Sequence, residues 1–199
     1  MAAAHAWYQA GGNDKALELL EIAEAGPLGE LPEAQAERLR AQVICARTDG
    51  RDGVLQLLRA AQRLDQSDRE LARVTYAQAL GLSIGRNPGP EVGRALSALP
   101  LYEPPDGTEL LLNGYGMFFA QGFPHGIDVM SRALDTLLSA PVGGELGIWV
   151  LEVAAQVAMN HWDAAGADTL SSGLIGLVRE MGAVGFLPIA LDRRAYYCV

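Results

Sequence analysis

Apolar residues recur along this chain at every third or fourth position, the spacing that places them on one face of an α-helix. Eight segments carry this pattern: Ala16–Ile22, Leu39–Ile44, Val54–Leu64, Leu71–Leu82, Leu110–Phe119, Ile127–Leu138, Leu146–Val157 and Leu170–Val178. The alternation with a period of two that indicates β-strands is absent over any useful length. Short breaks rich in Gly and Pro separate the segments. The sequence therefore predicts an all-α chain of about ten or eleven helices joined by brief turns.

Two positions carry the signature of a capping box, in which the first side chain bonds the amide three residues later and a glutamate there reaches back. These pairs are Ser67 with Glu70 and Asp106 with Glu109. We therefore expect Ser67 and Asp106 to cap the helices that follow them.

One apolar motif follows three Gly-bearing turns, "GGND", "GRDG" and "QGFPH", and indicates an internal repeat. A small residue opening the second helix of a hairpin lets the two helices pack closely, and the aliphatic residues after it face the hairpin interior. The three copies are Ala16, Leu17, Leu19, Leu20 and Ala23; Val54, Leu55, Leu57, Leu58 and Ala61; and Gly126, Ile127, Val129, Met130 and Ala133.

The motif resembles the tetratricopeptide pattern, which implies antiparallel helix hairpins stacked as a superhelix. The spacing of about 36 to 38 residues exceeds the ~34 of the strict repeat. A fourth hairpin around "MNHWDAAGADTLSSGL" fits the motif poorly, because Asp168 falls on an aliphatic position. The alternative is an all-α domain without a repeat.

Composition narrows the classes of partner. Half of the 199 residues are apolar and the formal net charge is −9, so the chain has material for a core and repels nucleic acid and anionic lipid. The apolar stretches are far shorter than the ~20 residues of a membrane span, and the N-terminus lacks a signal-peptide pattern. Cys45 and Cys198 lie far apart without a CxxC motif. We expect a cytoplasmic protein that contacts neither membrane nor nucleic acid directly.

Residues able to do chemistry are scattered. His5, His125 and His161 do not pair at helical spacing with each other or with a cysteine. The glutamates of one helical face, Glu18 and two more at positions 21 and 24, alternate with leucines as a solvated face does. We therefore predict no catalytic, cofactor-binding or metal-binding residue and no enzyme activity.

Aromatic residues and glycines are two further kinds of residue that are found at binding surfaces. Five aromatic residues precede the turns near the ends of first helices, where core packing is expected more than ligand contact: Trp7, Tyr8, Tyr115, Phe118 and Phe119. Two glycines inside the segment "LLNGYGMFFAQG" each cost a helix about 1 kcal/mol relative to Ala. They either permit close helix approach, which we favour, or mark a deformable spot.

A tetratricopeptide clamp for a peptide carboxylate needs basic residues on successive first helices. The available residues are Arg38, Arg40, Arg47 and Arg73. The chain has a single lysine and a negative net charge, so this kind of clamp is disfavoured and the ligand-binding residues stay unassigned.

Three segments carry a more specific resemblance: "GGNDKALELLEIAEAGPLGELPEAQAERLRAQV", "AAQRLDQSDRELARVTYAQAL" and "VREMGAVGFLPIAL". They resemble the helical middle region of large ATP-binding LuxR-type (MalT-like) bacterial transcriptional regulators. The matching features come in the family's order, at Glu24–Leu28, Leu64–Leu80, His161–Ala164 and Gly182–Leu191.

The resemblance implies a non-catalytic regulatory region whose nucleotide-binding and helix-turn-helix domains lie outside this chain. Related helical regions also occur attached to class III nucleotide cyclases, so the resemblance leaves the identity of the flanking domains open. Consistent with this division, the sequence has no GxxxxGK[ST] loop and no basic recognition helix. We expect residues 1–199 to be one helical-repeat domain and a fragment of a longer protein. Its concave face is expected to bind a protein partner or a small effector, or to pack against the regulator's other domains, with self-association also open. The alternative is a generic helical scaffold unrelated to transcription.

Overall fold

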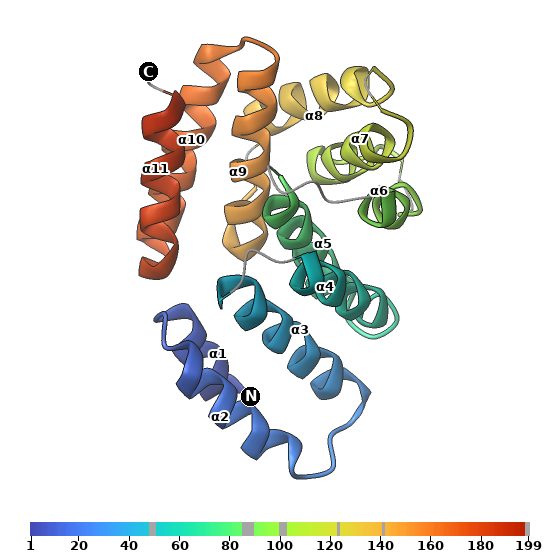
Figure 1. Cartoon of the computed structure of the whole chain (residues 1–199). Coiled ribbons are helices and arrows are strands. Elements are labelled where there is room, and N and C mark those ends of the chain that lie inside the picture. Colours follow the sequence, from blue (N-terminus) through green and yellow to red (C-terminus); the bar gives the residue numbers. More distant parts are fainter. Residues whose placement is uncertain (48–50, 85–89, 100–102, 123, 141, 198–199) are drawn as a thin grey trace. The chain divides into compact units, whose positions relative to one another are not determined.

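The computed structural model describes residues 1–47, 51–84, 90–99, 103–122, 124–140 and 142–197. In these ranges the chain is all-α, with eleven α-helices and one 3-10 turn (Figure 1). The elements are α1 (Ala2–Gln9), α2 (Asn13–Glu24), α3 (Glu30–Arg47), α4 (Arg51–Leu64), α5 (Arg69–Ser83), α6 (Pro90–Ser97), α7 (Gly107–Gln121), α8 (Ile127–Ser139), α9 (Gly144–Asn160), α10 (Ala164–Glu180), η1 (Val184–Phe186) and α11 (Leu187–Tyr197). The predicted fold class is confirmed, and every predicted helical segment lies within one of these helices.

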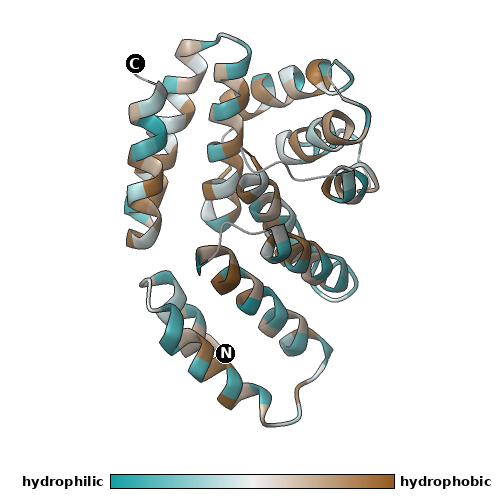
Figure 2. Ribbon diagram, in the orientation of Figure 1, coloured by the Kyte–Doolittle hydropathy of each residue, from teal (hydrophilic) through white to brown (hydrophobic). Residues whose placement is uncertain are grey.

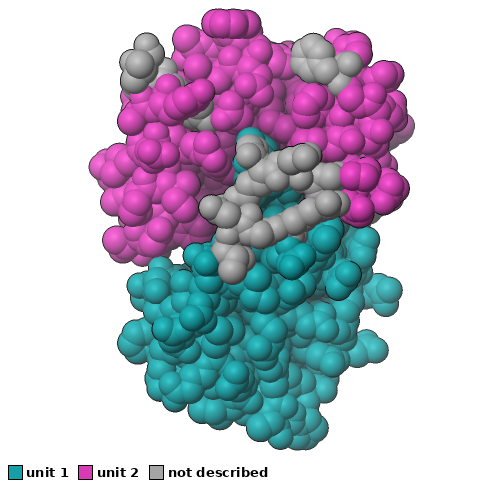
Figure 3. All heavy atoms as spheres, viewed as in Figure 1, with its two compact units in different colours: residues 1–86 teal, residues 87–199 magenta. Residues whose placement is uncertain are grey.

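The first compact unit spans Met1–Arg86 (Figure 3). Helices α1 and α2 pair as one hairpin, α3 and α4 pair as a second, and α5 packs on α4. Ala4, Leu20, Ala36 and Leu39 form a buried cluster that joins the two hairpins. This unit therefore has an apolar core of its own.

The second compact unit spans Asn87–Val199. Helix α7 packs against both α6 and α8, while α9 and α10 pair before α11 packs on α10. The fully buried Leu96, Leu111, Leu137 and Val150 show that this unit also has its own core. The single domain predicted over residues 1–199 stays a prediction, since each unit is described by itself.

Helix-hairpin packing follows the repeated motif. The residue that opens the motif is buried in all three copies, as Ala16, Val54 and Gly126. The second residue of each aliphatic pair is buried too, as in Leu20 of α2 and Leu58 of α4. The first copy follows the turn between α1 and α2, while residues 48–50 and 123 of the other two turns lie outside the described ranges.

A buried amide pair links α3 and α5. Gln42 of α3 donates through Nε2 to Oε1 of Gln78 on α5 at 2.8 Å, and the two residues are 36 positions apart. This separation falls at the repeat spacing expected from the sequence. Helices α3 and α5 are therefore in contact within the first unit.

Glycines let α7 approach its neighbours closely. A Cβ on Gly114 would lie 2.7 Å from Cγ of Met130 on α8, and a Cβ on Gly116 would lie 2.6 Å from the backbone nitrogen of Ser97 in α6. Neither distance is compatible with a side chain at these positions. The glycines of this helix serve close packing, the favoured one of the two sequence interpretations.

Helix starts confirm one predicted cap and correct the other. Asp106 and Glu109 form the expected capping box at α7, where the Asp106 carboxylate accepts the Glu109 N–H at 2.8 Å. The prediction for Ser67 is wrong: Asp68 caps α5 and accepts the Leu71 N–H at 3.0 Å. Ser67 instead belongs to the turn that closes α4, since its own N–H bonds the Leu64 carbonyl.

Both polar and apolar residues are present along each helix (Figure 2). None of the helices in the described ranges combines the length and the apolar character that crossing a membrane requires.

Candidate functional site

The residues that the sequence singled out for chemistry do not meet. His161 Nδ1 lies 3.2 Å from Oγ of Ser131, and His125 Nδ1 lies 3.2 Å from the Gly122 carbonyl oxygen. His5 sits on α1 in the other unit, and Cys45 is buried there. Cys198 lies outside the described residues. Across the described part of the chain, His, Cys, Asp and Glu side chains form no group of three that could hold a metal ion.

Two of the three glutamates on the outer face of α2 form ion pairs, so this face is not an open cluster of carboxylates. Glu18 pairs with Lys15 at 2.8 Å, and Glu24 pairs with Arg40 of α3. Glu21 is exposed. Glu24 thus links α2 to α3, while Glu18 and Glu21 belong to the solvent-exposed face of the hairpin.

Most of the aromatic residues before the turns pack against neighbouring residues. Tyr115 is buried, and its ring centroid lies 6.2 Å from that of Phe118 and 5.5 Å from that of Phe119. Trp7 is 48% exposed, yet a Cβ on Gly12 would lie only 2.6 Å from its ring. Trp7 therefore covers the first hairpin turn.

The four arginines considered for a carboxylate clamp serve separate roles. Arg38 is buried, and Arg47 pairs with Asp14 of α2 at 3.0 Å. Arg73 lies 3.8 Å from the Glu70 carboxylate on its own helix. Arg40 borders a hollow on the surface.

That hollow belongs to a groove between two helices of the first unit, here called the α3–α4 groove. One part, of about 320 Å³, is lined by Glu37, Arg40, Gln56, Arg59 and Arg63. The other, of about 420 Å³, is lined by Glu30, Ala34, Arg59, Gln62, Arg63, Gln66 and Ser67. Both parts are bordered by Arg59 and Arg63, so these two side chains lie at the centre of the groove.

Arg63 crosses the α3–α4 groove. From α4 it pairs with Glu33 of α3 at 3.0 Å and also with Glu37 one turn later on α3. The hydrogen bond with Glu33 and the charge of Glu37 raise the pKa of Arg63 above its ordinary value. These ion pairs are exposed and contribute little stability, but they hold the guanidinium between the two parts of the groove.

Arg59 differs from its neighbour. It is exposed one helical turn before Arg63, and it makes no hydrogen bond or ion pair with any residue that the structure describes. The side-chain amides of Gln56, Gln62 and Gln66 are likewise without a hydrogen-bond partner in the described part of the chain. The groove thus presents one guanidinium and three amides that a ligand can engage.

The sequence did not reveal this groove. Glu37 and Arg63 are 26 positions apart and belong to different helices, so no local motif contains both. The spacing of Gln56, Arg59 and Arg63 along α4 does put them on one helical face, which was the available signal.

A second hollow, of about 410 Å³, lies in the other unit and is lined by Gln156, Asp192, Arg193, Ala195 and Tyr196. Arg193 of α11 contacts the largely buried carboxylate of Glu152 on α9 at 3.3 Å. These contacts place the hollow between α9 and α11.

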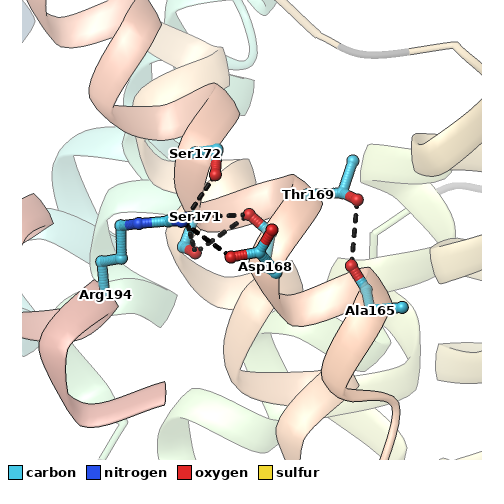
Figure 4. A network of polar contacts seen from close by, with 6 residues as sticks. All are labelled: Ala165, Asp168, Thr169, Ser171, Ser172 and Arg194. Carbon is cyan, nitrogen blue, oxygen red and sulfur yellow. Dashed lines mark hydrogen bonds and ion pairs between the residues drawn. The ribbon is translucent and has the colours of Figure 1, made fainter. Parts of the chain in front are cut away.

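The next residue, Arg194, points toward α10 (Figure 4). It pairs with the Asp168 carboxylate at 2.7 Å, bonds the Asp168 carbonyl at 3.1 Å and reaches the hydroxyls of Ser171 and Ser172. This network explains why an acidic residue at 168 is compatible with the fourth hairpin. Two successive arginines attach α11 to both helices before it, which is a structural role.

Comparison with protein-family models finds no match. Comparisons with curated proteins and with solved structures find no significant match either. The functional argument therefore depends on the geometry and on the residues themselves.

Proposed function

We propose that this chain is a non-catalytic interaction region whose helix hairpins present a binding groove to a protein partner or a small effector. The observation that carries the proposal is the α3–α4 groove, where Arg59 and three glutamine amides have no bonding partner in the described ranges. Grooves between helices of stacked hairpins are common binding surfaces, because the helices hold the lining side chains in fixed register.

More specifically, we propose that the region regulates a large LuxR-type transcriptional regulator. The support is the order of the segments that resemble this family, from Glu24–Leu28 through Gly182–Leu191. In this proposal, nucleotide binding and DNA binding belong to other domains. Partner or effector binding shifts the regulator between a silent and an active state, because the ligand binds one of these states better than the other.

A generic scaffold without a role in transcription is the second candidate. It is favoured by the observation that the repeated motif accounts for helix packing alone, through residues such as Ala16 and Leu20. A fold of this kind is compatible with many functions.

The gene itself provides the test. A reading frame that encodes a P-loop before this region and a helix-turn-helix after it supports the regulator, whereas one that encodes neither contradicts it. In the native organism, codons 1–199 of this numbering are then replaced in frame by a flexible linker, and transcripts are sequenced. We expect altered expression of a defined gene set. Unchanged transcripts beside an intact protein level rule out the regulatory role and leave the scaffold.

A further inference from the structure

We propose that the α3–α4 groove binds a peptide segment of a partner protein and that Arg59 holds an acidic side chain of that segment. This inference rests on the interaction role proposed above and specifies the ligand. It depends on the chemistry of the groove lining, on the pairing of each arginine and on the distribution of charge.

Nearly all residues that line the groove are polar, which distinguishes it from a typical site for a small organic ligand. Sites for such ligands are lined mainly by apolar and aromatic side chains. Here Ala34 is the only apolar residue that lines either part of the groove, and its other lining residues carry charges, amides or a hydroxyl. A ligand that matches this lining forms hydrogen bonds and ion pairs along its length.

Side-chain amides match a peptide backbone. Each glutamine amide donates two hydrogen bonds and accepts others, so it can pair with both the N–H and the C=O of an extended chain. Gln56 lines one part of the groove, and Gln62 and Gln66 line the other. The amides are thus spread along the groove rather than gathered at one point.

The arginines show where an acidic side chain binds. Arg40 already pairs with Glu24, and Arg63 pairs with two glutamates. Arg59 borders both parts of the groove and has no counter-ion among the described residues. A guanidinium forms two parallel hydrogen bonds with a carboxylate, so Arg59 is suited to hold an Asp or Glu side chain.

The surrounding carboxylates disfavour a nucleic acid. Glu30 and Glu37 line the groove itself, and Glu33 lies across it from Arg63. A polyphosphate backbone would meet these negative charges repeatedly, whereas a peptide with one acidic anchor meets Arg59 and otherwise presents neutral groups.

Charge is also divided unequally between the two units. Residues 1–86 carry ten basic and twelve acidic side chains, a formal charge of −2. Residues 87–199 carry five basic and twelve acidic side chains, a formal charge of −7. An acidic peptide is therefore repelled less by the unit that contains the groove.

The test is selection of binders from a phage-displayed library of random linear peptides, with the full chain immobilised. We expect the selected peptides to share an Asp or Glu at a fixed position. Synthetic copies are then measured by fluorescence anisotropy against the wild type and the Arg59→Gln variant. Loss of one bidentate charged contact is expected to weaken binding about tenfold, and Arg59→Lys is expected to recover part of it.

Arg132→Gln is the matched control, because Arg132 is exposed on α8 and lines none of the described hollows. It is expected to bind as the wild type does. Circular dichroism checks that each variant remains helical. Inorganic phosphate and a single-stranded oligonucleotide serve as competitors, and we expect neither to displace the peptide at ionic strengths where the peptide binds.

Three outcomes would overturn the inference. Peptides that bind Arg59→Gln as tightly as the wild type would place the interaction elsewhere and leave the interaction role intact. Displacement by the oligonucleotide would identify a nucleic-acid site. If the library yields no peptides that share an acidic residue, the proposal of a peptide ligand is wrong. The regulatory role would still be decided by the transcript measurement.

Discussion

Gln42 and Gln78 are the least solvent-exposed of the amide side chains in the first unit, with 1% and 0% exposure. Their mutual hydrogen bond uses one donor and one acceptor, and it leaves Oε1 of Gln42 and Nε2 of Gln78 buried without a hydrogen-bond partner among the described residues. A buried polar group costs free energy unless it is bonded. The pair thus favours one register of α3 on α5 at the expense of stability.

Replacing Gln78 with Met is expected to lower the free energy of unfolding by about 1–3 kcal/mol, because the buried Gln42 amide then loses its hydrogen-bond acceptor. The double variant Gln42→Met with Gln78→Met is expected to be at least as stable as either single variant. Urea unfolding of all four proteins measures the coupling. Additive losses from the two single changes would show that the amides do not depend on each other.

Tyr76 of α5 gives the first unit a pH dependence. Its hydroxyl donates to Oδ2 of Asp65 at 2.9 Å. Burial, followed by this hydrogen bond and the Asp65 charge, raises the pKa of Tyr76 above its ordinary value. The folded state therefore keeps the phenol neutral at pH values where the unfolded chain ionises it.

Stability from Tyr76 is fully present below about pH 10, the ordinary pKa of tyrosine, and is lost as the pH rises above it. In urea unfolding between about pH 9 and pH 11, the wild type is expected to lose more stability than Tyr76→Phe. At neutral pH the same substitution is expected to cost about 1 kcal/mol through the lost hydrogen bond. Tyr196→Phe, at a tyrosine that is 69% exposed, is the control and should keep the wild-type slope. Equal slopes for all three proteins would contradict the assignment.

At the scale of elements, α7 is held between α6 and α8 by contacts that glycine alone permits. A Cβ on Gly114 would lie 2.7 Å from Cγ and 3.2 Å from the nitrogen of Met130. The cost of glycine in the middle of a helix is about 1 kcal/mol relative to Ala. In α7 the close approach to α8 offsets that cost.

The Gly114→Ala variant is therefore expected to destabilise the protein by about 1–3 kcal/mol, although Ala favours the helix, because α7 and α8 must separate to accept the methyl group. Gly176→Ala is the matched control: Gly176 lies inside α10 and a Cβ there meets nothing within 4 Å. That change is expected to stabilise by up to about 1 kcal/mol. Chemical denaturation measures both, and a Gly114→Ala protein as stable as the wild type would show that α7 is free to shift.

Sequence periodicity predicted these elements because each helix has its apolar spacing within one short segment. The sequence shows Arg59 only as a polar residue on a helix. Its importance for binding comes from the ion pairs of its neighbours: Arg40 and Arg63 are paired with carboxylates, whereas Arg59 has no such partner among the described residues. Those partners come from α2 and α3, so their pairing depends on packing. The Ser67 cap failed for a local reason, since the next residue, Asp68, caps the helix instead and accepts from the Leu71 N–H.

At the scale of the whole molecule, the chain divides into two compact units near residue 86. Leu57 and Leu64 of α4 are fully buried in the first unit, where α5 packs on α4. A unit of this size buries enough apolar surface to fold by itself, although with a small margin. The two cores therefore indicate two folding units.

A fragment of residues 1–86 is expected to be helical by circular dichroism and to unfold cooperatively on heating. A shorter fragment, residues 1–64, is the control: it lacks α5, which uncovers the apolar face of α4, so it is expected to bind a hydrophobic dye and to unfold without a sharp transition. A fragment 1–86 that is unfolded alone would show that its core depends on the rest of the chain. Two fragments that melt alike would show instead that α5 does not complete this core.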